Sequence, residues 1–351
     1  DHDGDGYSEI PKLHGQTIGF RSFLKTTTYS KLTFEYHHME EFRRGGDLLN
    51  RPPHEANVAE QTEHSINGGG LKFDYFSPNE NHRFNVFASA QHINRDSYYG
   101  PGDRDPLDAY GNTTDLNWMA GSQYVYSFGK CIFMPSDLTA GIEFNQDKLE
   151  DNMWGYNRTV DQKVNIGSAF LQNEWKNDHW GFLIGGRLDK HNLIDHVIFS
   201  PRANLRYNPT ENINLRFSYS SGFRAPQAFD EDLHVENVGG NVAMVELADN
   251  LKEERSQSLS ASADIYHRFG AFQVNFLVEG FYTKLSDVFA LTDGEVVDGI
   301  LTRTRHNASG AQVLGLTLEG KMAYLNKIQV QAGVTLQQSH YSKPHIWNKE
   351  A

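Results

Sequence analysis

The chain lacks three features that would each indicate a different class of protein. It has a single cysteine, Cys131, so no disulfide can form within it and a disulfide framework is excluded. No apolar run approaches the ~20 residues that a membrane-spanning helix needs, and the mean hydropathy is −0.59. Basic charge is not in excess either, because the formal net charge is −13, which argues against nucleic acid as a partner.

The common catalytic motifs are missing as well. The sequence contains no Gly-x-Ser-x-Gly elbow, no His-Glu-x-x-His zinc motif and no phosphate-binding Gly-x-x-x-x-Gly-Lys loop. No catalytic residues are therefore assigned, and we expect a protein that is not an enzyme.

The dominant pattern is an alternation of apolar and polar residues with the period of a β-strand. Leu116, Trp118 and Tyr124 share one face of a segment whose other face carries Asp115 and Asn117. Many such segments exceed ten residues, which is longer than the ~5–6 typical of soluble strands. About fourteen segments show the pattern, and they begin near residues 11, 31, 62, 83, 115, 137, 161, 180, 198, 213, 251, 271, 302 and 328.

The connections between these segments alternate between short and long. Aromatic residues gather beside the short ones, as in an interfacial girdle. Long strands, short turns at one end and long loops at the other are typical of an outer-membrane barrel. The short connections are 26–30, 77–81, 177–179, 209–212, the neighbourhood of 270, and 326–327; the long ones are 43–61, 99–114, 148–160, 223–250 and 290–300. The aromatic residues beside the short turns are Phe76, Phe128, Trp175, Trp180, Tyr207, Phe269 and Tyr324.

Two sequence boxes in this pattern are more specific than the pattern itself. The first is Tyr-Ser-Ser-Gly followed by Phe223, Arg224, Ala225 and Pro226, and the second is the Leu-Lys-x-Glu-x-Ser box over 251–256. With them the chain resembles the barrel domain of TonB-dependent outer-membrane receptors, particularly those of Bacteroidetes-type bacteria. Further matching segments are Ser200 to Tyr207, Glu279 to Lys284, Asn307 with Gly310 and Ala311, and Gly315 to Glu319.

The resemblance implies an all-β fold, an antiparallel transmembrane β-barrel. Members of this family have a barrel of about 22 strands with a plug in the lumen. The whole chain, 1–351, is interpreted as a partial barrel domain of about 14 strands, with about five strands preceding it and about three following it. The plug and the terminal strands are then absent from this sequence. On this interpretation Arg224 of the first box faces the plug from the lumen wall.

The chain starts with alternating carboxylates at Asp1, Asp3 and Asp5, followed by Glu9. Carboxylates at alternate positions can converge on one hard cation, and Gly6 permits a sharp turn between them. The pattern departs from the EF-hand loop, because Lys12 stands where a glutamate is required. The sequence predicts a calcium site here, with an acidic turn that binds no metal as the alternative.

Aromatic residues in the long loops are candidates for binding a bulky ligand at the barrel mouth. The alternative is that large loops pack their own aromatic residues together. His234 is a further candidate, since haem receptors of the family carry an axial histidine in a comparable loop; the alternative for His234 is a solvated loop histidine. The candidate ligand-binding residues are Tyr98, Tyr99, Trp154, Tyr156, Phe229 and His234.

The resemblance implies an importer for a scarce nutrient, with a metal complex as its cargo: a ferric siderophore, cobalamin or haem. Its partners would be the lipid bilayer of the bacterial outer membrane, a TonB energy-coupling complex acting through the plug, and a surface lipoprotein. Two alternatives stay open at this point. One is a passive porin or adhesin barrel, and the other is a soluble calcium-dependent β-protein that recognises glycans.

Overall fold

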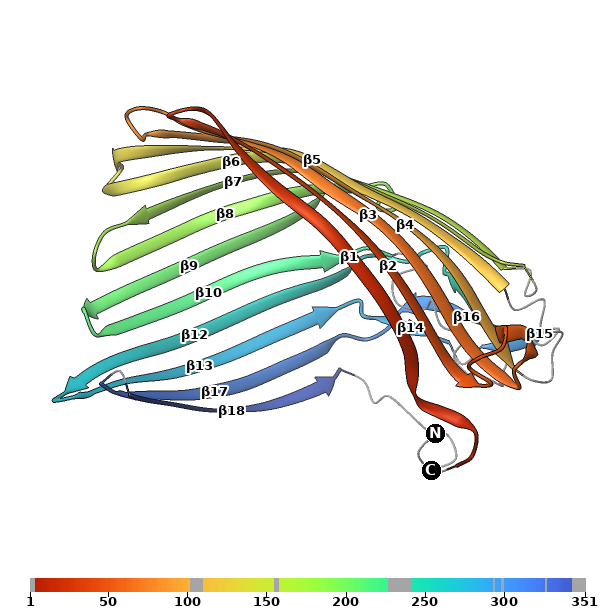
Figure 1. Ribbon diagram of the computed structural model, residues 1–351. Coiled ribbons are helices and arrows are strands. Elements are labelled where there is room, and N and C mark those ends of the chain that lie inside the picture. Colours follow the sequence, from red (N-terminus) through yellow and green to blue (C-terminus); the bar gives the residue numbers. More distant parts are fainter. Residues whose placement is uncertain are drawn as a thin grey trace.

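The computed structural model of the protein describes residues 4–101, 110–154, 158–226, 242–292, 294–297, 300–325 and 327–342. The strands in these ranges form two sheets, a large antiparallel one and a small mixed one. Fourteen strands form one large sheet. It curves into an open trough with β1 and β18 at its edges (Figure 1). In order, these strands are β1 Tyr7–Thr27, β2 Ser30–Asp47, β3 Val58–Phe76, β4 His82–Pro101, β5 Tyr110–Cys131, β6 Met134–Met153, β7 Arg158–Lys176, β8 Trp180–His191, β9 Ile198–Thr210, β10 Ile213–Arg224, β12 Glu254–Phe269, β13 Phe272–Ser286, β17 Ala311–Tyr324 and β18 Ile328–Tyr341.

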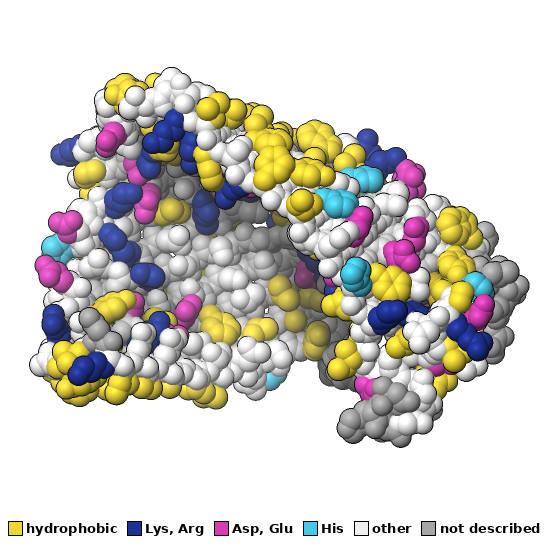
Figure 2. Space-filling view, in the orientation of Figure 1, with side chains coloured by type: hydrophobic (Ala, Val, Ile, Leu, Met, Phe, Trp, Pro, Cys, Tyr) yellow, Lys and Arg dark blue, Asp and Glu magenta, His cyan; other side chains and the backbone are white. Residues whose placement is uncertain are grey.

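Neighbouring strands of the large sheet pair in antiparallel register. Residues paired across strands lie on the same face, so the apolar face continues from Phe34 to Leu71 and on to Ala88. The opposite face carries pairs such as Ser218 with Ser260. Figure 2 looks into the trough, whose hollowed surface has few hydrophobic side chains, whereas these gather on the outer rim. The predicted all-β antiparallel barrel architecture is confirmed.

A second, four-stranded sheet is built from two of the long loops. β11 (Val242–Leu247) follows β10 and pairs in parallel with β16 (Ile300–Asn307), which also pairs with β14 (Phe289–Leu291) and β15 (Glu295–Val297). The strand expected to start near residue 302 therefore belongs to this small sheet, and the barrel strand is β17. The prediction was wrong because residues 302–307 alternate as well as a barrel strand does, and pattern alone cannot assign a strand to a sheet.

The strands at the loop end are longer than predicted. Three expected loops, 43–61, 99–114 and 148–160, lose residues to the strands on either side; β2, for example, continues to Asp47 and β3 begins at Val58. A short 3-10 helix, η1 (Pro53–Glu55), lies between them. The predicted boundaries were wrong because polar residues occupy both faces here, Arg43 on one and Arg44 on the other, which obscures the alternation.

The short-turn end follows the prediction more closely. β12 and β13 join through a two-residue turn in which Gly270 has φ 59°, a conformation that such hairpins require. The aromatic residues beside these turns stack on one another: the ring centroids of Trp180 and Tyr207 are 4.1 Å apart, and those of Phe272 and Tyr324 are 4.9 Å apart. Within the described residues, no helix has the length and apolar character needed to cross a membrane.

Candidate functional site

The two sequence boxes lie side by side at the loop end of the sheet. β10 ends with Phe223 and Arg224, and the register pairs these residues with Arg255 and Glu254 at the start of β12. Ala225 follows and is buried with Ile194 and Ile198, with Phe223 packed against them. The boxes thus meet because neighbouring antiparallel strands bring the end of one next to the start of the other.

Both boxes hold Phe289, the first residue of β14 in the small sheet. The guanidinium carbon of Arg224 lies 5.6 Å from the centroid of the Phe289 ring, within the range of a cation–π contact. The backbone N–H of Phe289 donates to Oε2 of Glu254 at 3.0 Å. Arg224 and Glu254 therefore fix the point at which the chain leaves β13 for the long loop. A contact of Arg224 with the plug stays a prediction.

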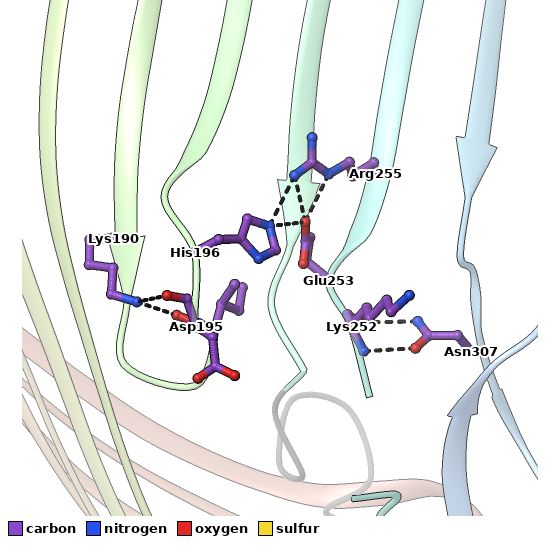
Figure 3. A network of polar contacts seen from close by, with 8 residues as sticks. Lys190, Asp195, His196, Lys252, Glu253, Arg255 and Asn307 are labelled. Atoms are coloured by element: carbon purple, nitrogen blue, oxygen red, sulfur yellow. Dashed lines mark hydrogen bonds and ion pairs between the residues drawn. The ribbon is translucent and has the colours of Figure 1, made fainter. Parts of the chain in front are cut away.

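Glu253, in the variable position of the second box, is the centre of a polar network (Figure 3). Its side chain is buried. Its Oε1 accepts a hydrogen bond from Arg255 Nε at 2.8 Å and lies 3.0 Å from His196 Nε2. Burial by itself would raise the pKa of this carboxyl, but the hydrogen bonds from Arg255 and His196 and the positive charge of Arg255 lower the pKa overall. Glu253 therefore joins the connection after β8 to the start of β12.

Asn307 ties two further segments together (Figure 3). Its Oδ1 accepts the backbone N–H of Lys252 at 2.8 Å, and its Nδ2 donates to the carbonyl oxygens of Lys252 at 3.0 Å and Asp287 at 2.7 Å. Nearby, Lys190 Nζ donates to the carbonyl of Asp195 at 2.8 Å. These contacts fix the ends of three connections, those after β8, before β12 and after β13. We call the residues that make them the loop-root network (His196, Lys252, Glu253, Arg255 and Asn307).

The predicted mouth aromatics fall into different environments. Tyr98 and Tyr99 are 2% and 3% exposed and pack with Ala59 and Met153. Trp154, by contrast, is 64% exposed. A ligand at the mouth would reach Trp154 directly and would reach the two tyrosines only after the surrounding loops moved. Tyr156, Phe229 and His234 lie outside the described residues, so the ligand-binding role of the whole set stays a prediction.

Close to these tyrosines, a series of buried polar side chains joins the ends of β4, β5 and β6. Arg95 Nη2 donates to Thr113 Oγ1 at 2.7 Å, and this hydroxyl donates to Asp151 Oδ1 at 2.6 Å. The Arg95 and Asp151 side chains are 8% and 2% exposed and lie 3.6 Å apart. Charges so far from water are tolerated because they are paired and hydrogen-bonded.

Lower on the concave face, charged side chains are paired across the strands. Arg187 donates from Nη1 to Glu143 at 2.9 Å and from Nε to Asp189 at 2.8 Å, and the Ser168 hydroxyl also donates to Asp189 at 2.6 Å. Arg202 lies in the same hollow of the wall. This gives the trough a polar and preorganised inner surface, suited to contact with water or with another polar body.

Only part of the predicted calcium loop can be placed. Asp5 and Glu9 are described, whereas Asp1 and Asp3 lie outside the described residues. Oδ1 of Asp5 accepts the backbone N–H of Tyr7 at 2.8 Å, which is the contact of an acidic turn. Among the described residues, no three His, Cys, Asp or Glu side chains are grouped as a metal site. The calcium site stays a prediction.

The loop-root network could not be found by pattern. His196 lies in a connection, 192–197, that the alternation did not mark as a long loop. Glu253 occupies an unspecified position of its box, and Asn307 is 55 residues from its partner Lys252. The one available signal was that the boxes and Asn307 are the same residues that carry the family resemblance.

The protein-family model described as "TonB dependent receptor-like, beta-barrel" matches residues 7–349 of the chain. The chain belongs to this family. Its β-barrel therefore lies in the bacterial outer membrane, with the apolar outer face toward lipid. No curated protein matches the chain.

Several solved receptors share the fold. The siderophore receptor PirA from Pseudomonas aeruginosa is 13% identical, with a TM-score of 0.75 over 94% of this chain and 57% of its own. The alcaligin receptor FauA from Bordetella pertussis is 14% identical, with a TM-score of 0.64 over 96% and 55%. The hemophore receptor HasR from Serratia marcescens is 13% identical, with a TM-score of 0.64 over 89% and 52%. The chain thus spans about half the length of these receptors.

Proposed function

We propose that this chain is barrel wall and loop structure of a TonB-coupled receptor that imports a small metal complex. A ferric siderophore is the first candidate, and cobalamin and haem are the others. The observation that carries the proposal is the family match over residues 7–349, together with the fold shared with receptors named for siderophores and for a hemophore.

The geometry supports a division of labour along the barrel. The paired charges of the inner wall, such as Arg187 with Glu143, offer a polar surface on which a plug can dock. The loop-root network fixes the bases of the loops, so that loop segments above it are presented to the outside on a rigid support. Energy would reach the plug from a TonB complex, and this chain contributes the passage and the capture surface.

Two additional elements belong to the proposal. A calcium ion held by Asp1, Asp3, Asp5 and Glu9 would offset two of the four negative charges of these carboxylates and fix the segment at the start of β1. A surface lipoprotein would cover the barrel mouth and retain the captured cargo. Both are independent of the identity of the cargo.

The test is calorimetric titration of the full-length, detergent-purified receptor with a ferric siderophore panel, haemin and cyanocobalamin. We expect tight binding of one compound and none of the others. A matched pair of variants, Trp154→Ala at the exposed mouth and Trp180→Ala at the opposite end, separates capture from stability: only the first should weaken binding. Repeating the titration with a calcium chelator tests the calcium loop. Absence of binding to every metal complex would contradict the proposal and favour a glycan or peptide cargo.

A further inference from the structure

A groove of about 580 Å³ lies on the apolar face of the large sheet, across β6 to β9. Small residues, Ala169 and Gly186, lie between larger ones. The larger side chains are exposed: Leu171 is 57% exposed, Ile184 is 63% and Phe199 is 55%. Leu138 and Leu188 also line the groove. In the family's barrel this face meets lipid, so the groove opens into the bilayer and not into the lumen.

The sequence produces the groove by placing small residues opposite large ones. The register pairs Leu171 with Gly186 and Ala169 with Leu188. A Cβ atom at Gly186 would lie 2.4 Å from the ring of Phe199, so a glycine is needed for this ring to fold over the strand. A larger side chain at either small position would fill the space that the groove occupies.

The groove lies toward the short-turn end of the strands. Trp175, one residue before the end of β7, lines it and is held in place: its indole N–H donates to the carbonyl of Cys131 at 3.0 Å, and its ring stacks on Phe133 with centroids 5.6 Å apart. Tryptophan at this level marks the membrane–water interface, and short turns face the periplasm. The groove therefore runs from the headgroup level of the inner leaflet into the hydrocarbon.

A polar side chain lies two residues deeper in the membrane than Trp175, on the same face of β7. Asn173 lies between Leu138 and Ile184 in the register and lines the groove. Its Nδ2 is buried and has no hydrogen-bond acceptor among the described residues. A buried amide donor without an acceptor destabilises the folded protein. Rotation of this side chain toward the groove would allow an oxygen from outside the protein to satisfy it.

We propose that the groove binds one inner-leaflet glycerophospholipid, with an acyl chain along Ala169 and Gly186 and an ester or phosphate oxygen on Asn173 Nδ2. An apolar surface alone gains little inside a bilayer, because lipid tails are equally apolar on every side. Close van der Waals packing against Leu171, Ile184 and Phe199, together with one hydrogen bond in a low-dielectric setting, supplies the preference for this place.

The test is native mass spectrometry of the full-length receptor in detergent micelles supplemented with dioleoyl phosphatidylethanolamine. We expect one retained phospholipid on the unaltered protein and loss of that mass from Ala169→Phe, which fills the groove. Ala261→Phe is the matched control, because Ala261 is an exposed alanine on the same face outside the groove; it should retain the lipid. Asn173→Leu keeps the side-chain size and should lower retention several-fold, which tests the hydrogen bond should Ala169→Phe fail to fold.

Three outcomes would overturn the proposal. One is equal retention by the unaltered protein and both groove variants. Another is retention of lipid A in place of the phospholipid, which would put the ligand in the outer leaflet. The third is a doubled protein mass that Ala169→Phe abolishes, because the groove would then be a contact between two copies of the receptor.

Discussion

Around Trp180, at the short-turn end, the side chains that meet are aromatic and come from one strand and its neighbour, whereas in the loop-root network they are charged or amide groups from segments far apart in the chain. Trp180 stacks on Phe182 of its own strand, β8, and on Tyr207 of the neighbouring strand, β9. Glu253 and Asn307 instead reach partners 57 and 55 residues away. The Trp180 cluster is stabilised by the burial of apolar area and by ring stacking. The loop-root network is stabilised by hydrogen bonds, which place no constraint on the sequence of the loops above it.

The difference follows from what surrounds each end. An aromatic ring at the membrane interface is half in lipid and half in water, and it gains from both. The loop-root network lies at the end that extends into water, where exposed apolar surface would favour aggregation, so polar contacts suit its partly exposed positions. The structure thus separates an aromatic cluster at the membrane interface from a polar network at the base of the loops.

The largest effect on this comparison is expected from Asn307→Ala. The substitution removes three hydrogen bonds to the backbone of Lys252 and Asp287, each worth about 0.5–1.5 kcal/mol. Local opening of the loop root should become easier by about 1.5–4.5 kcal/mol, because alanine offers neither a donor nor an acceptor in place of the amide. Hydrogen exchange at Lys252 and Phe289 in the full-length receptor should accelerate roughly ten- to a thousand-fold.

Asn81→Ala is the control for this variant. Asn81 is an exposed asparagine in the short turn between β3 and β4, and its replacement should leave exchange at the loop root unchanged. Equal exchange rates for Asn307→Ala and the unaltered receptor would show that the loop root is held by other contacts, and the contrast between the two ends would lose its basis.

A somewhat smaller effect is expected from Trp180→Ala at the opposite end. The ring stacks with centroids 5.6 Å from Phe182 and 4.1 Å from Tyr207, and each aromatic pair contributes about 0.5–1.5 kcal/mol. The free energy of unfolding in lipid vesicles, measured by urea titration, should therefore fall by about 1–3 kcal/mol. Trp154→Ala, at a 64% exposed site, should change it by no more than about 0.5 kcal/mol. A larger loss for Trp154→Ala than for Trp180→Ala would reverse the proposed roles.

The same difference explains what the sequence could predict. Strand alternation and the aromatic residues beside short turns are local, so Trp175, Trp180 and Tyr207 were placed correctly beside the short turns. The strand near residue 302 was assigned to the wrong sheet, because choosing between β16 and β17 requires knowledge of their partners. The pairing of Glu253 with His196 depends on two loop paths that no periodicity records.

The candidate ligand residues show the same limit. Tyr98 and Trp154 both lie near strand ends, and no local pattern distinguishes a buried residue from an exposed one there. Tyr98 is buried because Ala59 and Met153 come from other strands to cover it, whereas Trp154 has no such cover among the described residues and is exposed. Exposure at a barrel mouth is set by long-range packing, so it must be observed.

The smallest effect is expected from Glu253→Gln, which keeps the shape of the loop root and removes one charge. Charge-assisted hydrogen bonds are about twice as strong as neutral ones, but Arg255 and His196 are 42% and 55% exposed, so solvent screens the loss. We expect an effect of about 1 kcal/mol on local opening at neutral pH. Glu211→Gln, an exposed glutamate in the turn between β9 and β10, is the matched control and should have no effect on the loop root.

The pH dependence distinguishes this charge from the rest of the receptor. The pKa of Glu253 is lower in the folded protein than its ordinary value of 4.5, so its ionised form stabilises the fold. That stability is present at pH values above 4.5 and is lost as the pH falls from there through the lowered, folded-state pKa. Hydrogen exchange at the loop root, corrected for its intrinsic pH dependence, should therefore accelerate in acid for the unaltered receptor and much less for Glu253→Gln. An identical acid response in the two proteins would mean that another carboxyl controls the loop root, since the glutamine cannot titrate.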